Sequence, residues 1–232
     1  MRAKAVLFDK DGTLFDFQKS WSRWIGDEII RLAGGDLALA QDVADAIGYD
    51  LQNALILPHS PAIAGTSRDV AQVLLPFAPG ETLSGLQTTL DANAAELTPV
   101  EVLPLGPFAD SLLAMGLTLG LATNDNETSA RRHMAKFDLL DRFSFVAGYD
   151  SGHGAKPGPG MCNAFVAHCG VDPRHSVMVG DSLHDLHAGR SAGMQTVAVL
   201  TGVATADDLQ DHADVVLPDI GHLAAWLSDS II

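Results

Sequence analysis

The hydrophobic positions of this chain follow two different patterns. Residues 4–8 form a short continuous apolar run, which is typical of a strand buried on both faces of a parallel sheet. Residues 21–97 instead repeat their apolar positions at helical spacing, and we expect no buried strand among them. Glycines and prolines divide this region into helices expected at residues 20–32, 37–47, 68–75 and 81–97.

Beyond residue 104 the pattern changes to an alternation of strands and helices. Apolar runs predict strands at residues 117–122, 143–147, 176–179, 196–200 and 214–217. Helical spacing predicts helices at residues 108–115, 128–137, 161–169, across 188–193 and at 222–227. This alternation is typical of a parallel sheet covered by helices on both faces. The chain is therefore expected to be an α/β protein with a helical insertion after its first strand.

Composition narrows the class of partner. The 232 residues carry 14 basic and 29 acidic side chains, a net charge of −15, which argues against nucleic acid or an anionic membrane as partner. No apolar run approaches the roughly 20 residues of a membrane span, and residues 1–8 are too short in apolar content for a signal peptide. Cys162 and Cys169 fall seven apart in one expected helix, about 10 Å along its axis, which is too far for a disulfide. We expect a cytoplasmic protein.

Two carboxylates follow the first expected strand, where ligands collect in an open α/β sheet. Asp9 and Asp11 alternate along the backbone, so both side chains can enter one pocket if the extended conformation persists. At about 4 Å two such charges repel by roughly 4 kcal/mol at an effective dielectric of 20, so the pair favours a cation or a proton. The alternative is an acidic surface turn, for which Gly12 supplies the turn residue.

Three further polar groups lie at the same expected sheet edge. Thr123-Asn124 ends the second core strand, Lys156 lies in a loop rich in Gly and Pro, and Asp181 and Asp185 follow a later strand. A hydroxyl beside free amides suits a phosphate oxygen, a lysine can neutralise it, and carboxylates can hold Mg²⁺. Each also has a plain structural interpretation, namely a helix cap for Thr123 or either aspartate and a solvated lysine.

The four clusters occur together, in order, each at a strand end or in the loop beyond it. With these residues in view, the chain resembles the haloacid dehalogenase superfamily of phosphohydrolases. The motifs that carry the resemblance are Asp9-Lys10-Asp11-Gly12-Thr13-Leu14, Thr123-Asn124, Lys156-Pro157-Gly158-Pro159 and Gly180-Asp181-Ser182-Leu183-His184-Asp185. The insertion looks like the helical cap of the phosphoglycolate phosphatase-like branch. The resemblance implies a Rossmann-like parallel sheet core of residues 1–16 and 100–232 with an inserted helical cap domain of residues 17–99.

The resemblance also implies roles for the matching residues. Asp9 would be the nucleophile that forms an aspartyl-phosphate, and Asp11 the general acid and then the base for water. Mg²⁺ would bind Asp9, the main-chain carbonyl of Asp11, Asp181 and Asp185. Thr123, Lys156 and the amide of Asn124 would hold the phosphoryl oxygens. Lys10 departs from the usual apolar residue of the motif, and its side chain is expected to face away from the chemistry.

Several alternatives remain open at this point. A haloacid dehalogenase would use the same nucleophile but has no use for the acid Asp11, and a phosphomutase needs the same residues as a phosphatase. A receiver-like phosphate-binding domain would leave the insertion unexplained. His184 and His187 flank Asp185, but no Cys or Glu completes a transition-metal set with them.

The expected partner is a small phosphorylated metabolite, such as phosphoglycolate or a sugar phosphate, acted on by a monomer or homodimer. Arg68 is one of few cations in the acidic insertion. It is a candidate for contacting the substrate when the insertion closes over the pocket, although a surface arginine paired with Asp69 is the simpler interpretation.

Overall fold

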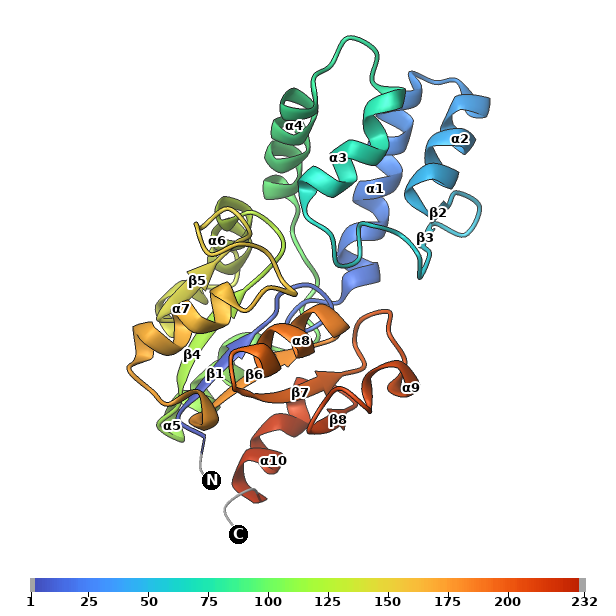
Figure 1. Cartoon of the computed structure of the whole chain (residues 1–232). Helices are drawn as coiled ribbons and strands as arrows, with labels where there is room; N and C mark the ends of the chain where they lie inside the picture. Colours follow the sequence, from blue (N-terminus) through green and yellow to red (C-terminus); the bar gives the residue numbers. More distant parts are fainter. Residues whose placement is uncertain (1–2, 230–232) are drawn as a thin grey trace.

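A six-stranded parallel sheet forms the centre of the protein, for which the computed structural model describes residues 3–229 (Figure 1). The strands run in the order β5-β4-β1-β6-β7-β8. Their bounds are β1 (Ala5–Phe8), β4 (Thr118–Ala122), β5 (Phe145–Ala147), β6 (Ser176–Gly180), β7 (Gln195–Val199) and β8 (Val215–Leu217). The chain builds outward from β1 through β4 to β5, then returns to β6 on the other side of β1. The strand order therefore reverses between β1 and β6, where ligands bind in such sheets.

Helices cover both faces of this sheet. One core packs Val6 and Phe8 of β1 against α5 (Leu105–Ala114), α6 (Glu127–Ala135) and α10 (Leu223–Asp229). The other packs Ala5 and Leu7 against α7 (Gly160–Cys169) and α8 (Leu183–Ser191). All four residues of β1 are fully buried, which explains its unbroken apolar sequence. The predicted α/β fold with a parallel sheet is confirmed.

The region between β1 and α5 is a separate helical layer, drawn above the sheet in Figure 1. It contains α1 (Phe17–Ala33), α2 (Leu37–Ile47), α3 (Ser67–Leu74) and α4 (Leu83–Glu96), which share a hydrophobic core of their own. Side chains cap their first turns: Asp16 for α1, Asp36 for α2, Thr66 for α3 and Thr82 for α4. The division into a core and a cap domain at residues 17–99 stays a prediction. The first and last residues of the expected core domain, 1–2 and 230–232, lie outside the described residues.

Some boundaries differ from the sequence-based expectation. Helix α1 begins three residues early because Asp16, not Ser20, accepts from the amide of Lys19, while the Ser20 hydroxyl accepts from the amide of Val100. The expectation of helices alone in the insertion missed a two-stranded antiparallel ribbon, β2 (Tyr49–Asp50) and β3 (Leu55–Ile56). The remaining short elements are α9 (Ala206–Leu209) and the 3₁₀ turns η1 (Leu75–Phe77), η2 (Leu140–Arg142), η3 (Pro173–His175) and η4 (Ile220–His222).

Two further expectations from the sequence concern a disulfide bond and membrane-spanning helices. Cys162 and Cys169 lie in α7 and both are free thiols, as their spacing predicted. Across residues 3–229, none of the helices has the length and apolar composition to cross a bilayer.

Candidate active site

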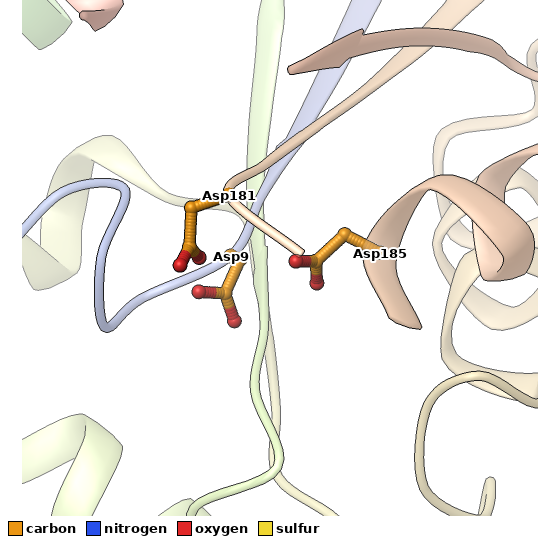
Figure 2. Close-up of side chains that lie close together, drawn as sticks. All are labelled: Asp9, Asp181 and Asp185. Atoms are coloured by element: carbon orange, nitrogen blue, oxygen red, sulfur yellow. The ribbon is translucent and has the colours of Figure 1, made fainter. Parts of the chain in front are cut away.

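Three carboxylates meet where the strand order reverses. Asp9 follows β1, Asp181 follows β6, and Asp185 lies in the first turn of α8, and all three are buried. One oxygen from each lies within 4.8 Å of the other two. Figure 2 shows the three side chains converging on one space from these elements. Among residues 3–229, these are the side chains grouped closely enough to hold a metal ion.

Two glycines leave room for this cluster. Gly12 turns the chain after Asp11 with φ +89°, a conformation that favours glycine, and a Cβ there would collide with the carboxylate of Asp181. A Cβ on Gly202 would collide with the same carboxylate. The hydroxyl of Thr201 donates to the carbonyl of Gly12 at 2.6 Å and so ties the two glycine loops together. The sharp turn of the first motif is therefore a requirement of the acidic pocket.

Lys156 lies between two of the carboxylates. Its Nζ donates to Oδ1 of Asp9 at 2.5 Å, to Oδ1 of Asp185 at 2.6 Å and to the carbonyl of Ala122 at 2.8 Å. All three of its hydrogens thus have an acceptor. Burial alone would lower the pKa of Lys156, but the charges of Asp185 and Asp9 raise it above its ordinary value, so the side chain is a fixed cation.

The carboxylates retain a surplus of negative charge. Burial raises the pKa of Asp9 to about 7, against the attraction of Lys156 and with the repulsion of Asp185. Burial and the charges of Asp9 and Asp185 likewise raise the pKa of Asp181 well above its usual range. A divalent cation with oxygen ligands would relieve this cost, and three converging carboxylates are a donor set that Mg²⁺ accepts. The residues present therefore fit a magnesium ion.

Thr123 and Asn124 lie at the end of β4, beside this cluster. The cap of α6 is Asn126, so the interpretation of Thr123 as that helix's cap is excluded. The Thr123 oxygen accepts from the amide of Asp125 at 3.0 Å, which leaves its proton free for another acceptor. The Asn124 side chain donates to the carbonyls of Ala64 and Lys156 and accepts from the amide of Lys156. It therefore holds the lysine loop in place and ties the insertion to the core.

Comparison with known proteins agrees with this geometry. The sequence model of the haloacid dehalogenase-like hydrolases matches residues 3–193. The chain belongs to this family. It is 28% identical over 235 residues to a phosphoglycolate phosphatase of Rhodospirillum rubrum, covering 97% of this chain and 90% of that protein. It is 27% identical over 227 residues to hexitol phosphatase B of Escherichia coli, covering 95% of this chain and 94% of that protein.

A solved structure of similar fold is that of a HAD phosphatase from Thermococcus onnurineus. It superimposes with a TM-score of 0.65 at 24% identity and covers 97% of both chains. The resemblance to this superfamily and to its phosphoglycolate phosphatase-like branch is thus confirmed over nearly the whole chain.

Asp11, the second carboxylate of the family motif, lies apart from the other three. Its Oδ1 accepts from Nε1 of Trp21 at 2.7 Å, and its Oδ2 lies 3.1 Å from Nζ of Lys10. Asp11 lines the pocket, with side-chain exposure of only 14%. Both of its oxygens are therefore occupied by donors, one from the insertion and one from the motif itself.

Lys10 was expected to face away from the pocket, which it does not line, but its contact with Asp11 was not expected. Its fully buried Nζ also donates to Oδ2 of Asp125 at 2.5 Å and contacts Nδ1 of His133 at 2.9 Å. Strand β1 ends at Phe8 and the chain already bends at Lys10, so the alternation of side chains along a strand no longer applies there. Lys10 thus contacts the carboxylate expected to be the acid.

The other candidate residues lie at different distances from this pocket. His184 lines it, whereas His187 is exposed and contacts His212 at 3.2 Å. Arg68 is exposed in the first turn of α3 and does not line the pocket, although its neighbour Ser67 does. A contact between Arg68 and substrate stays a prediction.

Several pocket residues were not singled out from the sequence. They come from the insertion (Trp21, Trp24 and Asp91) and from the core (Asp125 and Ser182), and all of them line the pocket. Asp125 follows Thr123-Asn124 directly, so its place at the strand end was the one available signal. Trp21, Trp24 and Asp91 depend on how the helical layer packs on the sheet, which the linear pattern does not specify.

Proposed function

We propose that the protein is a magnesium-dependent phosphatase that hydrolyses a small phosphate monoester through an aspartyl-phosphate on Asp9. The observation that carries the proposal is the convergence of three buried carboxylates and Lys156 at the reversal of strand order. The family of the chain supports it, as do the phosphatase names of relatives that it matches over nearly their full length.

Magnesium would be held by Asp9, Asp181 and Asp185 together with the main-chain carbonyl of Asp11. When bound, it would supply positive charge that neutralises the carboxylates and polarises the phosphoryl group. Lys156 contributes a second fixed positive charge beside Asp9. These charges favour the ionised form of Asp9, whose burial otherwise favours protonation.

In the first step a carboxylate oxygen of Asp9 attacks phosphorus, and the bond from phosphorus to the leaving oxygen breaks in line with it. Asp11 donates a proton to that leaving oxygen. The Thr123 hydroxyl, the amide of Asn124 and Lys156 stabilise the charge on the remaining phosphoryl oxygens. In the second step Asp11 removes a proton from water, which attacks phosphorus and releases inorganic phosphate and free Asp9.

Asp11 can carry that proton only after one of its contacts changes. Both Trp21 Nε1 and Lys10 Nζ present hydrogens to its oxygens, which suits the ionised carboxylate and leaves no oxygen for a third hydrogen. Because Trp21 belongs to α1, movement of the insertion would release Oδ1 toward the leaving group. We propose that residues 17–99 act as a cap that covers the site in this way.

Turnover of an aryl phosphate tests the proposal. Release of phosphate should require magnesium, stop in excess chelator and resume on addition of magnesium, with little recovery in calcium because its larger shell misplaces the nucleophile. Asp181→Asn should lose most activity, whereas the exposed Asp42→Asn is the matched control and should retain it. Full turnover in chelator would contradict the proposal.

A further inference from the structure

The pocket above the carboxylates has two unlike walls. Residues of the core give a polar floor, whereas the insertion gives a wall that is mostly apolar. We define the apolar wall as Phe17, Trp21, Trp24, Ile25, Ala62, Ile63, Ala64, Val70, Leu90 and Ala94. The space between floor and wall opens to solvent.

The charges around this space have mostly one sign. Six aspartates line it, namely Asp9, Asp11, Asp91, Asp125, Asp181 and Asp185. Of the lysines and arginines among residues 3–229, Lys156 alone lines it, and its three hydrogens are already donated. A second anion on the organic part of the substrate would face the insertion side, where Asp91 lines the pocket and, among the described residues 17–99, none of the lysines or arginines does. Burial of such an unpaired charge is strongly unfavourable.

The insertion side also offers few free hydrogen bonds. The Thr66 hydroxyl donates to Asp69, Ser67 pairs with the hydroxyl of Tyr149, and Asp91 accepts from Asn126. Trp21 Nε1 donates to Asp11. Trp24 Nε1 is buried with no partner among the described residues, so the wall retains at most that side-chain donor. The hydroxyl oxygens of a polyhydroxylated leaving group would therefore find few side-chain donors on this wall to replace water.

The apolar wall begins next to the proposed acid. Trp21 Nε1 lies 2.7 Å from Oδ1 of Asp11, so the Trp21 ring borders the proposed acid. Trp24 packs edge-on against Trp21, with ring centroids 5.3 Å apart and an interplanar angle of 89°. The two indoles thus form an apolar surface at the place where the organic part of the substrate emerges.

We infer that the substrate is a phosphate monoester of an uncharged alcohol with an apolar or aromatic body, and that Trp24 is a specificity-determining residue for it. This inference rests on the proposed phosphatase function and specifies its substrate class. The apolar body binds against the wall of Trp21 and Trp24, while the phosphoryl group lies over Asp9.

Matched pairs of esters that differ by one carboxylate test the charge argument. We expect kcat/KM for benzyl phosphate to exceed kcat/KM for 4-carboxybenzyl phosphate by at least roughly 100-fold. We expect the same of kcat/KM for ethyl phosphate compared with kcat/KM for phosphoglycolate. Ile63→Lys, which adds a cation to the apolar wall, should raise kcat/KM for phosphoglycolate relative to kcat/KM for ethyl phosphate. Arg68→Ala should leave both ratios unchanged, because Arg68 lies outside the pocket.

Variants of Trp24 test the apolar contact. The ratio of kcat/KM for benzyl phosphate to that for methyl phosphate should fall by roughly 10–200-fold in Trp24→Ala and be largely restored in Trp24→Phe. Ile30→Ala is the matched control, because Ile30 belongs to the same helix, is 50% exposed and does not line the pocket. If Trp24→Ala fails to fold, Trp24→Phe and the ester pairs in the unaltered protein decide the matter.

The outcomes separate this inference from the function on which it rests. Hydrolysis of methyl and ethyl phosphate in magnesium, combined with a preference for the carboxylated member of each pair, would overturn the substrate class and leave the phosphatase intact. Loss of phosphoglycolate turnover in Arg68→Ala would do the same and would place Arg68 in the site. Hydrolysis of none of the esters would overturn the phosphatase function and this inference with it.

Discussion

One buried lysine, Lys10, belongs to the first family motif, and another, Lys156, contacts it. Each of them lies between two aspartates. Lys156 contacts Asp9 and Asp185, and Lys10 contacts Asp11 and Asp125. Each lysine has its pKa raised by its two aspartates against the effect of burial. The two clusters therefore share their side-chain types, their burial and their neighbourhood.

They differ in what completes them. The Lys156 cluster gains a third carboxyl group, Asp181, so with every carboxyl ionised three negative charges face one positive charge. The Lys10 cluster is completed by neutral groups: His133 accepts from Lys10, and Trp21 donates to Asp11. The first cluster thus retains two excess negative charges and the second only one. A surplus of two is what a divalent cation neutralises, so the comparison supports the proposal that the first cluster, and not the second, holds a metal.

Exchanging the two motif carboxylates for amides gives the largest expected difference between the clusters. Asp9→Asn should abolish turnover of every ester, because no covalent intermediate can form. Asp11→Asn keeps the nucleophile and should lose about 10²–10⁴-fold with an alkyl phosphate, the usual contribution of a general acid. An aryl phosphate, whose oxygen leaves without protonation, should still transfer its phosphoryl group to the enzyme.

The intermediate should then accumulate in Asp11→Asn, because the same residue activates the water of the second step. Acid quench with radiolabelled phosphate, followed by peptide mapping, should place the label on Asp9. Label on another residue, or equal residual activity of the two variants with both leaving groups, would contradict the assignment.

Removing each lysine tests the difference in surplus charge through stability. Lys10→Met leaves the buried carboxylates of Asp11 and Asp125 without a positive partner. It should lower the free energy of unfolding by about 3–5 kcal/mol, whether or not magnesium is present. Lys156→Met leaves Asp9 and Asp185 without a positive partner. Because these are proposed magnesium ligands, magnesium should restore much of the lost stability. Urea unfolding at pH 8 with magnesium or with chelator measures both.

The double variant Lys10→Met/Asp125→Asn is the control for the Lys10 cluster. It removes one of the two stranded charges and should be more stable than Lys10→Met alone. A rescue of Lys10→Met by magnesium equal to that of Lys156→Met would show that the two clusters do not differ in the proposed way.

The sequence predicted one of these clusters far better than the other. Asp9 and Asp181 were recognisable because parallel strands end at one edge, so a polar residue after a buried strand has a known location, whereas Lys156 lies in the loop beyond β5 and was identified through the family motif. In the other cluster, Lys10 contacts Asp125 and His133, which lie 115 and 123 residues away in sequence, and Asp11 contacts Trp21 of the insertion. Alternation along a strand could not place Lys10, because β1 ends at Phe8 and the chain already bends at Lys10.

The same limit applies to the fold. Long apolar runs and helical spacing located the six core strands and the four long helices of the insertion. The β2–β3 ribbon was missed because its two-residue strands are too short to show a period of two. The apolar wall was missed for another reason: Trp21 and Trp24 occupy ordinary core-facing positions of a helix, and only its packing over the sheet turns them toward the pocket.

The smallest expected effect concerns His133 in the Lys10 cluster. Its Nε2 contacts the carbonyl of Ala94 at 2.9 Å, so Nε2 donates, and its Nδ1 accepts from the ammonium of Lys10. Burial, together with the charge of Lys10, lowers the pKa of His133 to about 3. Folding thus holds this imidazole neutral, whereas the unfolded chain binds a proton near pH 6.5.

The sign of the pH dependence follows from this difference. Below about pH 6.5 the unfolded state binds one more proton than the folded state, so stability falls as the pH is lowered from 6.5 toward 3. By pH 5 the loss should be about 2 kcal/mol relative to pH 8, because 1.5 pH units separate pH 5 from the unfolded pKa. Asp9, whose raised pKa acts in the opposite direction, contributes equally to the variant and cancels in a comparison. His133→Gln should therefore lose about 2 kcal/mol less than the unaltered protein between pH 8 and pH 5, measured by urea unfolding in chelator. The exposed His168→Gln should behave like the unaltered protein, and an equal loss in both glutamine variants would mean that His133 is protonated in the folded state.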